Sequence, residues 1–113
     1  MLANESELFG NRNRTMVLVA LRLLEETYPS ELAALLELQL FSVQSILASF
    51  ERQGLAVSRL AGRTRLVKLN PRYFAAKDLK TLLWTLGKED VPLQKLLAAK
   101  RRRPRQPGKP GLL

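Results

Sequence analysis

The side chains best suited to chemistry in this sequence are hydrogen-bonding and cationic groups between residues 42 and 68. The first group is uncharged and consists of Ser42, Gln44 and Ser45. A glutamine amide can bond to two atoms of an adenine edge, and a serine hydroxyl can donate or accept at several base edges. The cationic group consists of Arg52, Arg59, Arg63, Arg65 and Lys68. Guanidinium and ammonium groups bind phosphate oxygens, so the two groups together favour a nucleic-acid partner.

The distribution of charge supports the same interpretation. The formal net charge is +9. Residues 1–51 hold seven acidic and three basic side chains, whereas residues 52–88 hold nine basic side chains and one acidic. The first segment is therefore net −4 and the second +8, and residues 100–113 add +6. Positive charge is concentrated where phosphate neutralisation is needed if this region lies on a duplex.

Other kinds of site lack the residues that they need. Cys and His are absent, so disulfides, thiolate catalysis, zinc fingers and imidazole metal sites are excluded. The carboxylates show no clustered spacing, the serines lack a His or Lys partner at a recognisable spacing, and there is no glycine-rich phosphate loop. We therefore expect no metal, no cofactor and no enzymatic activity.

Two short helices and a hairpin are predicted for the stretch from Ser30 to Leu69. Ser30 is a candidate N-cap for the first helix, and a second helix is expected from Phe41 or Ser42 until Gly54. The apolar residues that recur at helical spacing in these two helices are Leu32, Leu35 and Leu36, followed by Val43, Ile46, Leu47 and Phe50. The period then changes from 3.6 to about 2, which predicts two strands. Ala61-Gly62-Arg63 forms the turn between them, with either Leu66 or Val67 pointing inward.

Further helices are expected on both sides of this stretch. An apolar helix is predicted from about residue 11 to 27, ended by Tyr28-Pro29. A helix from near Asp78 to Leu86, closed by Gly87, and a short helix capped by Asp90 follow the hairpin. The expected fold is mainly α with a small β-hairpin wing, an α+β winged helix-turn-helix.

The predicted organisation is an N-terminal arm (1–10), one domain (11–99) and a basic tail (100–113). The tail combines Pro, Gly and Arg and cannot bury a core, so we expect disorder in the free protein. No run of about twenty apolar residues and no secretory signal pattern is present, which leads us to expect a cytoplasmic protein, nucleoid-associated when bound to DNA, with no membrane partner.

The run from Glu31 to Leu69 resembles the DNA-binding half of bacterial and archaeal ArsR-like and MarR-like winged-helix regulators. The residues that carry the resemblance are mostly core positions: Leu38, Val43, Leu47, Phe50, Gly54 and Leu55. The segment Leu69–Phe74 also looks like the exit from the second wing strand in small members of this group. The resemblance covers roughly residues 12–87. The absence of Cys and His departs from the metal-sensing members.

The resemblance implies a transcriptional regulator that binds double-stranded DNA as a homodimer. Ser42, Gln44 and Ser45 would face base edges, while Arg52, Arg59, Arg63, Arg65 and Lys68 would contact phosphates or the minor groove. The dimer contacts are expected on the two helices after the hairpin together with the apolar first helix, and the candidate residues are Leu79, Leu83, Trp84 and Leu86. Trp84 could also pack in the core, line a ligand pocket or act as a stacking platform. Nothing in the sequence points to a particular small-molecule effector.

Two apolar residues leave alternatives open. Leu40 and Phe41 stand where comparable regulators often carry small polar residues, so they can contact thymine methyl groups, pack into the core or form a protein-binding surface. The basic hairpin can likewise keep an edge strand soluble instead of binding DNA. The second hypothesis is therefore a winged-helix interaction adaptor or antitoxin-like subunit without sequence-specific DNA binding.

Overall fold

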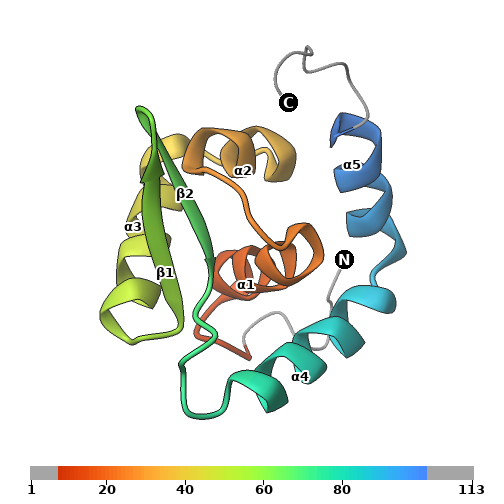
Figure 1. The fold of residues 1–113 in the computed structure, drawn as a ribbon. Helices are drawn as coiled ribbons and strands as arrows, with labels where there is room; N and C mark the ends of the chain where they lie inside the picture. The colour runs from red at the N-terminus through yellow and green to blue at the C-terminus, as the bar shows by residue number, and fades with distance from the viewer. Residues whose placement is uncertain (1–7, 102–113) are drawn as a thin grey trace.

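The computed structural model describes residues 8–101, which form a mainly helical α+β arrangement (Figure 1). Within this range the elements follow in the order α1 (Arg12–Leu24), α2 (Pro29–Leu36), α3 (Leu40–Arg52), β1 (Ala56–Ala61), β2 (Thr64–Leu69), α4 (Ala76–Lys88) and α5 (Val91–Arg101). The predicted α+β class, with one antiparallel hairpin, is confirmed. Most of the predicted arm and tail, residues 1–7 and 102–113, lies outside the described residues.

Helix α1 is the centre of the core. Its middle residues, from Thr15 to Leu21, are all buried, as its nearly all-round apolar sequence predicts. In Figure 1, α1 lies between the hairpin with α3 on one side and α4 with α5 on the other. Asn11 begins the helix by accepting a hydrogen bond of 2.9 Å from the backbone N–H of Arg14.

The end of α1 differs from the sequence prediction. The helix stops at Leu24 instead of residue 27, and Glu25 adopts a φ of 71°. The N–H of Glu26 donates to the carbonyl of Leu24, which makes a tight γ-turn around Glu25. Thr27 then exchanges two backbone hydrogen bonds with Val67 on β2. The chain leaves the helix early because Thr27 pairs with the hairpin.

Helices α2 and α3 begin earlier than predicted. Pro29 occupies the first turn of α2 and Tyr28 the N-cap position, so the prediction that Ser30 caps this helix is wrong. Proline fits there because the N–H that it lacks has no partner within the helix. Helix α3 begins at Leu40, and the axes of α2 and α3 meet at 119°. This steep crossing leaves one side of α3 exposed while its other side packs on the core.

The hairpin pairs Ala56 with Leu69 and Ala61 with Thr64, which leaves Gly62 and Arg63 as a two-residue turn. Gly62 has a φ of 64°, as such tight hairpin turns require. Of the two alternatives for the inward residue on β2, Val67 is the fully buried one.

The last two helices close the other side of the core. Helix α4 begins at Ala76, two residues before Asp78. Gly87 does not end α4 as predicted; it lies inside the helix and is buried. A Cβ atom there would lie 3.0 Å from the Cδ2 atom of Leu23, so this glycine permits close packing of α4 on α1. Asp90 caps α5 as predicted, accepting a hydrogen bond of 3.1 Å from the N–H of Leu93.

Candidate nucleic-acid interface

Helix α3 separates a buried face from an exposed polar face. Val43, Leu47 and Phe50 are buried. Gln44 and Ser45 are exposed, and Ser42, the third base-reading candidate, is half-buried. The side chains of these three candidates form no hydrogen bond to one another. The exposed face of α3 therefore presents the Gln44 amide and the Ser45 hydroxyl more openly than the Ser42 hydroxyl.

Leu40 and Phe41 occupy the first turn of the same helix and are not core residues. Leu40 is 43% exposed and Phe41 is 78% exposed. The alternative in which Phe41 packs into the core of the chain is thereby excluded. Both remaining alternatives, contact with a base and contact with a protein, require such exposure.

A groove of about 320 Å³ joins the start of α2, the exposed face of α3 and the tip of the hairpin. Its lining consists of Tyr28, Pro29, Ser30, Leu40, Gln44, Arg63, Thr64 and Arg65. The groove brings one base-reading candidate, Gln44, together with two cationic candidates, Arg63 and Arg65. These side chains come from separate elements, and the steep α2–α3 crossing and the hairpin turn place them together.

The start of α2 is the part of this groove that the sequence analysis missed. Tyr28 is the N-cap residue of α2 but makes no side-chain capping hydrogen bond. The early N–H groups of a helix lack partners within the helix and favour anions. Pro29 is the available signal, because proline is common in a first helical turn, whereas the sequence prediction uses Pro29 to end the preceding helix and starts the next element at Ser30.

Arg65 is held beside α3 by a small network of polar side chains. Its guanidinium forms an ion pair with Glu51 and donates a hydrogen bond of 3.1 Å to the Ser58 hydroxyl. The Ser58 hydroxyl in turn donates to Glu51 over 3.2 Å. The network connects both strands of the hairpin to the last turn of α3.

Arg59 and Lys68 lie on the other face of the hairpin. Successive side chains on a strand alternate between faces, and Arg59 pairs in register with Leu66, whereas Arg65 pairs with Leu60. Arg59 forms an ion pair of 3.2 Å with Glu26, and Lys68 lines the same small hollow. The five cationic candidates therefore do not form one continuous stripe. Only Arg63 and Arg65 border the groove, while Arg52 is exposed at the end of α3.

Arg14 on α1 anchors the far half of α3. Its guanidinium donates hydrogen bonds to the Ser49 hydroxyl (2.9 Å) and the Gln53 side-chain oxygen (3.3 Å). The same group donates to the Phe9 carbonyl over 2.8 Å and lies 4.5 Å from the centre of the Phe50 ring. This role could not be predicted from the sequence, because a single arginine on an apolar helix carries no signal of a partner about 35 residues away.

The predicted dimer residues are divided between the core and the surface. Leu83 is fully buried within the chain, so it is a core residue and offers no surface to a partner. Leu79 and Leu86 are half-buried against the core. Trp84 is 46% exposed, with the Arg22 guanidinium 5.2 Å from its ring centre. Trp84 also lines an apolar hollow of about 480 Å³ between α1, α4 and α5.

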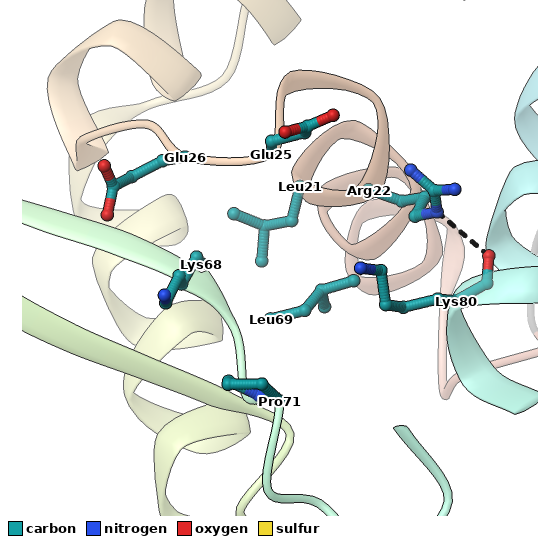
Figure 2. Close-up of a pocket in the computed structure, with 8 residues that line it drawn as sticks. All are labelled: Leu21, Arg22, Glu25, Glu26, Lys68, Leu69, Pro71 and Lys80. Carbon is teal, nitrogen blue, oxygen red and sulfur yellow. Dashed lines mark hydrogen bonds between the residues drawn. The ribbon is translucent and has the colours of Figure 1, made fainter. Parts of the chain in front are cut away.

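A second hollow, of about 470 Å³, lies between the end of α1, β2 and the start of α4 (Figure 2). The carboxylates of Glu25 and Glu26 stand along one side, and Lys68 and Lys80 approach from the hairpin and from α4. Arg22 donates a hydrogen bond of 3.0 Å to the Lys80 carbonyl. Because the lining carries both signs of charge, a phosphate group there would meet carboxylates as well as cations. This hollow is therefore a poorer phosphate site than the groove beside α3.

Within residues 8–101 no group of three or more acidic side chains is arranged to hold a metal ion. Over the same range, no single helix is both long and apolar enough to cross a membrane; α2 and α3 reach that length and composition only as a pair bent by 119°.

Comparison of the chain with protein-family models, with curated proteins and with solved structures found no match.

Proposed function

We propose that this protein is a winged helix-turn-helix transcriptional regulator that binds double-stranded DNA, with α3 in the major groove and the hairpin as the wing. The observation that carries the proposal is the shared groove of Gln44, Arg63 and Arg65. A duplex presents base edges and phosphates at neighbouring positions. An amide can bond to the base edges, and two guanidinium groups can bind the phosphates. The order of helix, steep turn, helix and hairpin supports the same fold.

The ion pairs of the wing are compatible with DNA binding. Arg65 and Arg59 both form their ion pairs at the surface, where such a pair contributes about 0–1 kcal/mol. A phosphate can therefore replace the carboxylate at little energetic cost. Arg63, at the tip of the wing, forms no ion pair within residues 8–101 and is free to contact a backbone or a minor groove.

A homodimer is part of the proposal. Two copies related by a two-fold axis would place their α3 helices about one turn of DNA, roughly 34 Å, apart, which implies a palindromic site. Trp84 on α4, which is 46% exposed, is the candidate contact. Trp is enriched at such interfaces because it combines a large apolar surface with one polar group.

The test is selection of sequences from a randomised pool of duplex DNA, at low salt and again near physiological salt. We expect enrichment of a palindromic motif that survives the higher salt, because base contacts persist when counterion release weakens. A Gln44→Ala variant in the same selection should shift the preferred sequence. Binding that disappears with salt and enriches no motif would contradict the proposal.

A second candidate function is supported by a separate observation. Leu40 and Phe41 are exposed, and Arg59 and Arg65 are folded against carboxylates of the chain itself. These are the features expected of an interaction adaptor whose first turn of α3 contacts a protein. We place this function second because it leaves the grouping of Gln44, Arg63 and Arg65 without a role.

A further inference from the structure

Phe41 is the most exposed large apolar side chain on α3. It is 78% exposed, whereas Phe50 at the other end of the same helix is fully buried. Both have the same ring, so their different burial comes from helical position alone. Phe50 lies on the face with Val43 and Leu47, and Phe41 lies on the opposite, exposed face.

The helical period places Phe41 beside the candidate base-reading residues. Gln44 and Ser45 follow it by three and four residues, and side chains at these separations are neighbours on one helix surface. Phe41 also lies in the first turn of α3, and the N-terminal residues of a recognition helix are the ones that contact base edges. Leu40 differs, since it borders the groove that faces the wing and the start of α2.

The major groove offers one large apolar partner to such a ring. Its base edges carry mainly hydrogen-bond donors and acceptors, and the largest apolar group among them is the 5-methyl group of thymine. A phenylalanine cannot bond to the polar edges, and burying it against them leaves them without their water partners. Thymine is therefore the base beside which the Phe41 ring is accommodated.

We propose that Phe41 packs on the 5-methyl group of one thymine in each half of the DNA site, so that the protein selects thymine there by apolar contact. This inference rests on the proposed function and names one base that the protein would prefer in each half of its DNA site. Gln44, one turn further along α3, is then positioned to bond to an adjacent base.

The test uses the full-length protein and the duplex that the selection experiment identifies. Each thymine of the site is replaced in turn by deoxyuridine, which lacks only the methyl group and keeps the same base pair. At one position in each half-site we expect affinity to fall about fourfold, the factor that corresponds to one methyl-sized apolar group. In Phe41→Ala the same replacement should change affinity by less than about 1.5-fold, because the partner of the methyl group is already absent.

Phe74→Ala is the matched control. Phe74 is 91% exposed and lies in the segment between β2 and α4. This variant therefore removes an exposed phenyl ring that is not on α3. It should keep the wild-type response to deoxyuridine. Circular dichroism of both variants checks that they are folded, which is expected because neither ring is in the core.

The outcomes separate this inference from the proposed function. Wild-type protein that binds its selected site but is insensitive to deoxyuridine at every thymine would overturn the role of Phe41 and leave DNA binding intact. Sensitivity to deoxyuridine that persists unchanged in Phe41→Ala would assign the methyl contact to another residue. This result would also overturn the role of Phe41. A chain that enriches no site overturns both.

Discussion

Arg65 on β2 and Glu51 in the last turn of α3 form an ion pair, and the Ser58 hydroxyl on β1 bonds to both partners. The pair lies beside the groove that Gln44 and Arg63 share. It places a carboxylate close to the surface on which a polyanion is proposed to lie. Glu51 therefore orients Arg65 and would also repel a phosphate placed there.

Glu51→Gln should strengthen binding to duplex DNA. The substitution removes the negative charge and keeps an oxygen for the Ser58 hydroxyl, so we expect affinity at low salt to rise about two- to fivefold. Stability should fall by less than about 1 kcal/mol, as for an exposed pair. Fluorescence anisotropy across a salt series measures the affinity, and Glu89→Gln, at the exposed end of α4, is the control. Unchanged affinity would place the DNA elsewhere.

Arg63→Ala combined with Arg65→Ala should weaken binding to all duplex sequences. Loss of two phosphate contacts is expected to flatten the dependence of log K on log salt by about one to two units. The control is Lys77→Ala with Lys95→Ala, which removes the same charge from exposed positions on α4 and α5. If both pairs of substitutions lower affinity equally, only net charge matters and the wing has no special role.

Arg14→Met should destabilise the fold. Methionine retains an apolar stem but cannot bond to Ser49, Gln53 and the Phe9 carbonyl, nor place a cation over Phe50. We expect a loss of about 1–3 kcal/mol in the free energy of unfolding, measured by urea denaturation. Arg12→Met, two residues earlier and exposed, should stay within about 0.5 kcal/mol of the wild type. Equal stability of the two variants would show that Arg14 is not an anchor.

Leu83→Ala and Trp84→Ala should separate core packing from dimer formation. Leu83 is fully buried, so its truncation should cost about 2–5 kcal/mol of stability. Trp84→Ala should leave the monomer folded and shift sedimentation towards the monomer. Wild-type protein that sediments as a monomer at high micromolar concentration would contradict the dimer.

Glu25→Gly should stabilise the protein. Glu25 has a φ of 71°, and a non-glycine residue in such a conformation carries strain of about 1–3 kcal/mol. Glycine relieves most of this strain but gives the unfolded chain more freedom, so we expect a net gain of about 1 kcal/mol and a higher Tm. Glu89→Gly, where φ is −89°, should lower the Tm instead. A lower Tm in both variants would mean that the γ-turn stores no strain.

The helical and hairpin elements could be predicted because the residues that define them are local. Gly54 adopts the positive φ expected after α3, Val67 is inward, and Asp90 caps α5. Each of these roles depends on a residue type and its immediate neighbours. The same holds for the exposure of Gln44 and Ser45, which follows from the helical period of Val43, Leu47 and Phe50.

The errors arose where contacts distant in sequence decide the structure. Gly87 looked like a helix end, but it is required by the approach of Leu23. The chain leaves α1 before Thr27 because Val67 provides a backbone partner for Thr27 forty residues later. Leu83 is predicted as a dimer contact, but α4 packs on α1 and Leu83 is buried within the chain. The division of the arginines between two faces of the hairpin likewise depends on a register that the turn sets.

Along α3, buried residues that pack on the core alternate with exposed residues. Val43, Leu47 and Phe50 bind it to the core, and Phe41, Gln44 and Ser45 contribute almost nothing to that packing. Substitutions at the second set can therefore accumulate without unfolding the protein. If α3 reads DNA, a lineage carrying this fold can acquire a new operator by changing three side chains, and an engineer can redirect it by randomising the same three codons.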